Sequence, residues 1–186
     1  MADLKEHLYP LPEVCVCYLV RPSANGDEVL LGRKKFGLGA GNLVGPGGKI
    51  ESGETPLDAI VREVQEETSI VISKPRLAGE LTYFFASKPS WSQKSWVFTC
   101  RDFVGDAAET DELAPQWFGV SIIPVDRMWD DAKYWLPLAL VNERAFASAG
   151  EQPAQQRVIA TFEFASDLRT VCASDHAAFA SMTPQQ

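Results

Sequence analysis

Hydrophobic and polar positions along the chain change from a strand-like to a helical period and back, which outlines the predicted elements. Residues 13–20 (EVCVCYLV) are β-branched and apolar and predict a strand; the turn signal Asn25-Gly26 and a second strand over 28–35 follow. From 55 to 68 the apolar residues fall at i, i+3, i+4 and i+7, which predicts an amphipathic helix. Its apolar stripe consists of Leu57, Ile60, Val61 and Val64.

The second half of the chain continues the mixture of strands and helices. A second amphipathic helix is predicted over 137–149, and a short strand with turns over 111–128. Further strands are predicted at 76–87, 95–105, 156–164 and 168–173. We therefore expect one α/β (α+β) domain at 13–173, with a mixed sheet and helices packed against it, an N-terminal tail at 1–12 and a loosely ordered C-terminal tail at 174–186.

Composition and charge narrow the class of function. A net charge of −8 argues against a sequence-independent grip on DNA or RNA, which depends on Lys and Arg neutralising phosphates. No segment has the length and apolarity of a membrane span, and the start of the chain has no apolar signal-peptide core. We expect a cytoplasmic monomer with no nucleic-acid polymer and no membrane as partner. The cysteines are interpreted as small hydrophobic residues in a reducing compartment: Cys15, Cys17, Cys100 and Cys172.

Candidate chemistry lies beside the apolar stripe of the first helix. Glu63, Glu66 and Glu67 fall within roughly 100° of arc on that helix. Like charges at these spacings repel, and the helix dipole disfavours anions in the last turn, so the arrangement is costly unless something compensates. A divalent cation such as Mg²⁺, which prefers oxygen ligands, is the natural candidate. A solvated acidic face is the alternative.

The segment before this helix is dense in glycine. Gly45-Pro46-Gly47-Gly48 can bring backbone close to a ligand and aim amides or carbonyls inward. The segment is not a phosphate-binding P-loop, because Lys49 is followed by Ile50 and the earlier glycine is missing. Its glycine spacing also fails the dinucleotide-binding pattern.

The two features together resemble a known family motif. Residues 48–70 run from a glycine through Glu54 to Arg62-Glu63-Val64-Gln65-Glu66-Glu67-Thr68-Ser69-Ile70. This order is similar to the Nudix box, a glycine and a glutamate followed by R-E-apolar-x-E-E-x-G-apolar. Ser69 departs from it, because the family has a glycine there, just past the helix, where a left-handed residue often ends it. Serine supplies no metal ligand, so the departure does not imply loss of activity.

The resemblance implies a fold, a metal and a reaction. The fold would be the Nudix α/β/α sandwich around a central mixed sheet. Mg²⁺, or Mn²⁺ in its place, would be held by Glu63, Glu66 and Glu67, with the Gly47 carbonyl as a further ligand. Arg62 would brace the carboxylates and Glu54 would support the junction of loop and helix. Water would attack a phosphorus of a diphosphate linkage in a small-molecule nucleotide.

The resemblance extends beyond the box, because particular segments resemble the oxidised purine nucleoside triphosphatase branch of the MutT-like enzymes. They are LLGRKKFGLGAG, GPGGKIESGET, DELAPQWF and MWDDAKYWLPL. The resemblance implies a further metal-side carboxylate at Glu112, base reading by Asp131 and stacking on Trp129. It places the other substrate contacts at Lys34, Val44, Gly48, Tyr83 and Trp135. Two polar groups of the branch are replaced in this sequence. Val44 occupies the position of an asparagine, and Ala132 occupies the position of the second of two adjacent aspartates.

Three other interpretations remain open. The substrate of a Nudix hydrolase could instead be an undamaged dNTP, a methylated purine or a diadenosine polyphosphate. A Nudix-fold sensor would bind a nucleotide without hydrolysing it, yet Arg62, Glu63, Glu66 and Glu67 are all intact. A purely structural acidic helix would leave the glycine loop and the box unexplained. Glu112 could also be an exposed turn residue, and Trp129 and Trp135 could be core residues.

Overall fold

The computed structural model describes residues 10–149 and 157–175 of the chain. Their strands are β1 (Glu13–Ser23), β2 (Gly26–Lys34), β3 (Leu43–Val44), β4 (Val71–Ser73), β5 (Arg76–Phe85), β6 (Gln93–Cys100), β7 (Asp102–Val104), β8 (Leu113–Gly119), β9 (Val158–Phe164) and β10 (Val171–Asp175). The helices are α1 (Pro56–Thr68) and α2 (Ala132–Ala149). Short 3-10 turns are η1 (Pro89–Trp91), η2 (Val120–Ile122) and η3 (Val125–Arg127).

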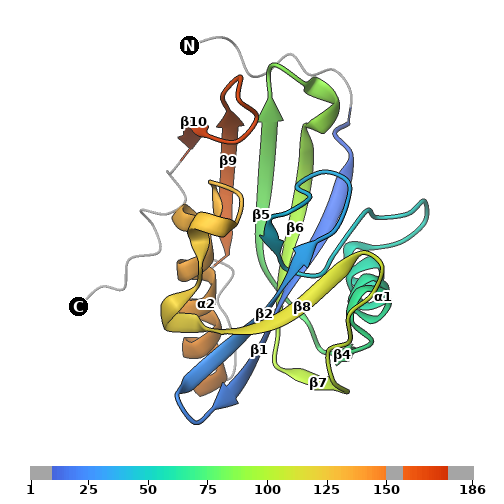
Figure 1. The fold of residues 1–186 in the computed structure, drawn as a ribbon, viewed down its shortest axis with the longest axis vertical. Helices are drawn as coiled ribbons and strands as arrows, with labels where there is room; N and C mark the ends of the chain where they lie inside the picture. The colour runs from blue at the N-terminus through green and yellow to red at the C-terminus, as the bar shows by residue number, and fades with distance from the viewer. Residues whose placement is uncertain (1–9, 150–156, 176–186) are drawn as a thin grey trace.

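The main sheet is mixed, as the sequence predicts (Figure 1). Its strands follow the order β10-β9-β5-β6-β1-β2-β3, and β8 also pairs with β2. The pairs β1–β6 and β5–β9 are parallel, whereas the other pairs of this sheet are antiparallel. β4 and β7 form a separate two-stranded sheet. β1 connects the two parts of the main sheet, because its first residues pair with β6 and its last with β2.

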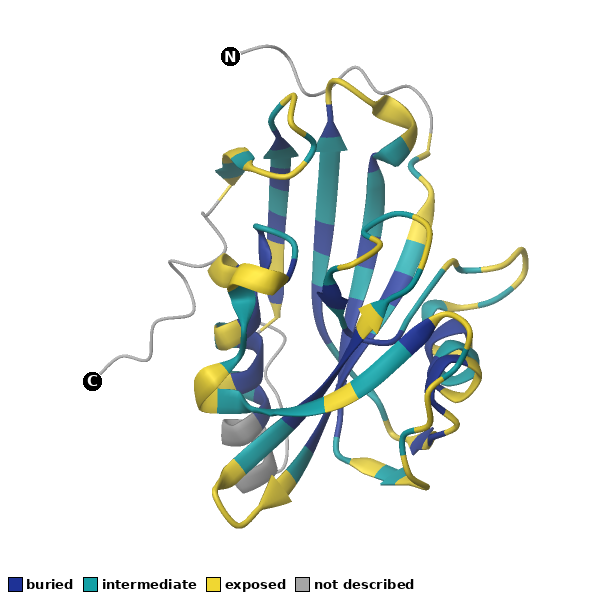
Figure 2. Ribbon diagram, in the orientation of Figure 1, coloured by how far each residue is buried: buried dark blue, intermediate teal, exposed yellow. Residues whose placement is uncertain are grey.

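The helices cover opposite faces of this sheet, which confirms the α/β/α arrangement. Side chains alternate along β1. Cys15 and Cys17 enter the core that includes Ile60 and Val64 of α1, whereas Tyr18 enters the core that includes α2. Figure 2 shows the buried positions along the middle strands and on the inner sides of the helices, with exposed positions at the loops.

Two details of the predicted helices are wrong. Leu57 is 48% exposed, so the apolar stripe of α1 begins at Ile60. The second helix starts at Ala132 rather than at residue 137 and continues through Pro137. Proline inside a helix costs a backbone hydrogen bond. Burial of Trp135 and Leu136 against the sheet outweighs that local preference.

Smaller corrections concern turns and termini. Ser23 pairs with Gly26, so the hairpin turn lies one residue before the predicted one. β10 reaches Asp175, past the domain boundary predicted at residue 173. Of the two predicted tails, residues 1–9 and 176–186 lie outside the described residues. All four cysteines are free; Cys15, Cys17 and Cys100 are buried and Cys172 is exposed. No helix among the described residues is long and apolar enough to cross a membrane.

Candidate active site

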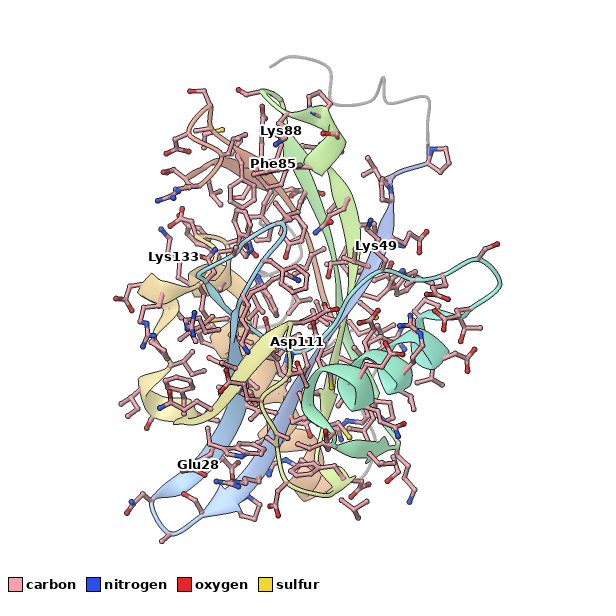
Figure 3. All side chains as sticks on the ribbon, turned by 45° about the vertical axis from the view of Figure 1, so that its right-hand side comes forward. Glu28, Lys49, Phe85, Lys88, Asp111 and Lys133 are labelled. Atoms are coloured by element: carbon pink, nitrogen blue, oxygen red, sulfur yellow. The ribbon has the colours of Figure 1, made fainter. Side chains whose placement is uncertain are left out.

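The loop before α1 lies so close to β1 and α1 that a Cβ at either of two of its glycines would be in very close contact with a neighbouring atom. The amide of Cys15 donates to the carbonyl of Gly48, at 2.8 Å. A Cβ on Gly47 would lie 2.2 Å from the Cys15 carbonyl oxygen, and a Cβ on Gly48 would lie 2.5 Å from both carboxylate oxygens of Glu63. Figure 3 shows Lys49 in the same loop, on its way to α1. The glycines therefore let the loop backbone touch the acidic face of the helix.

Both ends of α1 are fixed by local hydrogen bonds. Thr55 caps the first turn: its side chain accepts from the amide of Asp58, whose carboxylate accepts in return from the amide of Thr55. Ser69 ends the helix with a left-handed backbone (φ 64°), and its amide donates to the carbonyl of Gln65. Serine thus adopts the conformation for which the family motif has glycine. Fixed ends hold the glutamates of the helix in a defined register beside the loop.

Glu67 is the most deeply buried acid of this group. Its side chain is almost entirely covered, with the whole residue 4% exposed, and Oε2 accepts from the amide of Gly47 at 2.8 Å. The pKa of Glu67 is raised to about 7, chiefly by burial and to a smaller extent by the charges of Glu63 and Glu112, whereas the Gly47 amide and Lys34 act in the opposite direction. A carboxylate with a pKa near neutrality can both accept a proton and bind a cation.

Arg62 connects the acids of α1 to the loop. Its guanidinium forms two hydrogen bonds with Glu54, at 2.8 and 2.9 Å, and Nη1 reaches Glu63 at 2.9 Å and Glu66 at 3.1 Å. Nη2 also donates to the carbonyl of Lys49. The hydrogen bonds from Arg62 lower the pKa of Glu54 to about 2. One side chain thereby fixes two helix carboxylates relative to the loop–helix junction, the position in which the family resemblance implies a bracing role.

The carboxylates of this group are suitable ligands for a divalent cation, but their side chains are not arranged as a complete metal site. Among residues 10–149 and 157–175, no three His, Cys, Asp or Glu side chains lie close enough to hold one ion. Glu66 is the outlier, with a side chain 62% exposed. Glu63 and Glu67 each use one oxygen for a protein hydrogen bond, and burial raises the pKa of both. The charge of Glu112 raises both pKa values further, so this carboxylate lies near the group. Repelling, partly desolvated oxygen donors are stabilised by a hard cation.

A second group of predicted residues meets on the α2 side of the sheet. Asp131 is 2% exposed, and its Oδ2 accepts from the hydroxyl of Tyr83 at 3.0 Å and from the indole of Trp135 at 2.7 Å. Its Oδ1 is buried without a hydrogen-bond partner among the described residues. Burial raises the pKa of Asp131 to about 6, although both donors oppose the shift. Trp135 is itself a core residue, packed edge-on against Tyr18.

Trp129 lies in an aromatic cluster that the sequence did not reveal. Phe85 and Phe164 stack with ring centroids 4.5 Å apart, and Trp129 packs edge-on against both. Trp91 packs edge-on against Phe85. Figure 3 shows Phe85 at one end of the sheet, away from the β1–β2 hairpin. A Cβ on Gly39 would lie 2.7 Å from the Trp129 indole nitrogen, so the β2–β3 loop touches this ring. In a sequence, aromatic residues in strands predict only that a core is present, so the sequence pattern did not indicate this cluster.

The remaining predicted contacts occupy the β2–β3 region. Lys34 ends β2, and its charge lowers the pKa of Glu67, which places the ammonium near the acids. Val44 is half-buried and pairs with Gly32. Separately, an open cleft of about 860 Å³ lies on the outer side of α1, between Leu57, Val61 and Pro75. Arg62 and Glu66 line it, but Glu67 and Asp131 do not, so we place the substrate site on the loop side of the helix instead.

Comparisons with known proteins agree with this geometry. The family model of the NUDIX domain matches residues 11–160. An oxidized purine nucleoside triphosphate hydrolase from Danio rerio is 38% identical over 117 residues, which cover 63% of this chain and 74% of that protein. The enzyme of the same name from Mus musculus is 36% identical, covering 63% and 75%. The crystal structure of a MutT protein from Bacillus halodurans has the same fold, with a TM-score of 0.67, 22% identity and coverage of 89% and 97%.

Proposed function

The chain belongs to the Nudix family, and from that membership we propose that it hydrolyses a modified, chiefly oxidised, purine nucleoside triphosphate. The products would be the nucleoside monophosphate and pyrophosphate, and the role would be to remove damaged nucleotides from the pool. The observation that most supports this proposal is the buried hydrogen bond from the Gly47 amide to Glu67. It lies beside Glu63 and Glu66, which Arg62 bridges. A cytoplasmic monomer fits this role.

The residues of α1 supply the chemistry of the phosphate side. Nudix hydrolases generally use divalent metals. We assign Mg²⁺ here, with Mn²⁺ as a substitute. The ion would be held by Glu63, Glu66, Glu67, Glu112 and the Gly47 carbonyl, and when bound it would neutralise phosphate oxygens and activate water. Glu66 has to turn inward to take part.

The protein's own groups would perform three tasks in that reaction. Arg62 holds Glu63 and Glu66 by hydrogen bonds, so their carboxylates enter the reaction already oriented. Glu67, buried and held by the Gly47 amide, would accept a proton from the attacking water. Lys34 places a positive charge beside the same acids, where the phosphate chain arrives.

The α2 side of the sheet would bind the base. Trp129 offers an aromatic surface for stacking, and Asp131 offers a carboxylate for a hydrogen bond. Val44 and Ala132 contribute no polar group. A site that hydrogen-bonds its substrate can discriminate more strongly than an apolar pocket, which usually achieves about 1–3 kcal/mol. Selectivity for oxidised over ordinary dGTP is therefore expected to be weaker than in relatives with both polar groups, and undamaged dNTPs or diadenosine polyphosphates are the alternative substrates.

A hydrolysis screen tests the proposal. The panel contains 8-oxo-dGTP, 2-oxo-dATP, dGTP, dCTP and a diadenosine polyphosphate, each with Mg²⁺ and with EDTA, and the products are separated by ion exchange. We expect the oxidised purines to give the highest kcat/KM and EDTA to abolish turnover. A clear preference for dCTP or the dinucleotide would refute the purine assignment while leaving the hydrolase assignment intact. Binding without turnover of any compound would instead identify a nucleotide sensor.

A further inference from the structure

The two carboxylate oxygens of Asp131 have different surroundings. Oδ2 accepts from the Tyr83 hydroxyl, which comes from β5, and from the Trp135 indole, which comes from α2. Oδ1 is buried and has no hydrogen-bond partner among the described residues. A buried acceptor without a donor destabilises the folded protein, unless a ligand supplies the donor. The orientation of Asp131 is therefore maintained at a cost in stability.

Tyr83 and Trp135 are well placed to prevent the carboxylate from turning. The Tyr83 ring stacks on Phe162 with centroids 6.1 Å apart, so its hydroxyl is anchored to the sheet. Trp135 is buried and packs edge-on against Tyr18, so its indole nitrogen is anchored to the core. Two donors from different elements converge on one oxygen, and a rotation that moved Oδ2 away would break both hydrogen bonds.

We propose that Tyr83 is a positioning residue, which together with Trp135 occupies Oδ2 of Asp131 and so leaves Oδ1 as the single acceptor for an N–H group of the base. This inference rests on the proposed function and makes it more specific. The site takes a purine whose edge presents an N–H donor to one carboxylate oxygen. Because Val44 and Ala132 are apolar, no polar side chain at either position would compensate for a misplaced Oδ1. Tyr83 thereby affects base selectivity through Asp131, whereas a pocket-lining role would use only its ring.

The variant Tyr83→Phe separates these two roles, because phenylalanine keeps the ring and removes the hydroxyl. We expect the KM for 8-oxo-dGTP to rise about 5- to 10-fold, with kcat within about 2-fold of wild type. The preference for 8-oxo-dGTP over dGTP, as a ratio of kcat/KM, should fall by a similar factor. The Tyr83 hydroxyl lowers the pKa of Asp131, so the acid limb of the kcat/KM profile should also move to higher pH. The groups acting on that carboxylate are Tyr83, Trp135, the backbone amide of Asp131 itself, Asp130 and Tyr18.

Tyr18→Phe is the matched control. It also removes one tyrosine hydroxyl from this core, but the described donors to Asp131 are Tyr83 and Trp135, not Tyr18. Its substrate preference should stay at the wild-type value. Melting temperatures of both variants report any loss of stability. If Tyr83→Phe does not fold, Trp135→Phe removes the other donor to Oδ2 and should lower the same preference.

The outcomes distinguish this inference from the proposed function. If wild type hydrolyses neither 8-oxo-dGTP nor dGTP, the proposed function fails. If wild type prefers 8-oxo-dGTP and Tyr83→Phe keeps the wild-type KM and preference, the positioning role is refuted and the proposed function stands. Equal losses in Tyr83→Phe and Tyr18→Phe would also refute it, because they would indicate a general effect on the core.

Discussion

Replacing Gly48 with alanine perturbs the active site through one methyl group. The new Cβ would lie 2.5 Å from both carboxylate oxygens of Glu63, whereas a carbon–oxygen contact normally needs about 3.3 Å. The carboxylate must therefore move by roughly 0.8 Å. A misplacement of about 1 Å in an active site can reduce the rate by about 100-fold, or about 2.7 kcal/mol of transition-state stabilisation. Glu63 is held by Arg62, so the displacement also disturbs that hydrogen bond.

Stability should change much less than activity. The clashing atoms are the end of a flexible side chain, so we expect the free energy of unfolding to fall by less than about 1 kcal/mol. The assay compares kcat with Mg²⁺ and the thermal melting of wild type, Gly48→Ala and the control Gly119→Ala. Gly119 pairs with Glu28, which Figure 3 shows near the lower end of the molecule and well away from Lys49, and a Cβ there meets only the Ile122 side chain. Near-normal kcat in Gly48→Ala would refute the role given to Glu63.

Three further predictions concern α1. Glu67→Gln should lower kcat by roughly 100-fold or more in steady-state assays with Mg²⁺, because the glutamine side chain neither binds the cation nor accepts the proton. The far-UV circular dichroism spectrum should stay unchanged. A rate near that of wild type would exclude Glu67 from the site. Ser69→Gly should raise the melting temperature by about 2–4 °C without changing kcat, because glycine relieves about 1 kcal/mol of strain in the left-handed backbone at this position. An unchanged melting temperature would show that the backbone of serine is not strained there. Glu67 has a pKa of about 7 in the folded protein, above its ordinary value of 4.5, so without metal its contribution to stability falls as pH rises from about 4.5 to about 7. Mg²⁺ requires the ionised form, so its stabilising effect on thermal melting should be larger at pH 8 than at pH 6, and Glu67→Gln should remove most of this difference.

The sequence predicted the region of the box well because its signals are local. The apolar period of residues 57–64 sets the helix face that carries Glu63 and Glu67. The glycine density of residues 45–48 predicted a backbone that can come close to a ligand, and in the structure this backbone also lies against Glu63 and Glu67 of α1. Each of these signals lies within a few residues of the structure it specifies.

The base side was less predictable because it depends on distant pairings. The parallel pairing of β5 with β9 places Tyr83 opposite Phe162, and no local pattern encodes that register. The two hydrogen bonds on Asp131 likewise join residues from β5 and α2. Family resemblance placed Asp131 at the base, but the separate surroundings of its two oxygens required the structure. The exposure of Glu66 could not be predicted from a helical wheel either, because a helical wheel assigns a side chain to a face but does not determine its burial.

The reaction proposed for this helix and loop is cleavage of a purine nucleoside triphosphate between its α- and β-phosphates. Its most direct test is one turnover experiment with 8-oxo-dGTP, Mg²⁺ and ¹⁸O-labelled water, with the initial products analysed by mass spectrometry. We expect the monophosphate and pyrophosphate in equal amounts, with one ¹⁸O atom in one of the two. Labelled orthophosphate with the nucleoside diphosphate as the first products would contradict the claim.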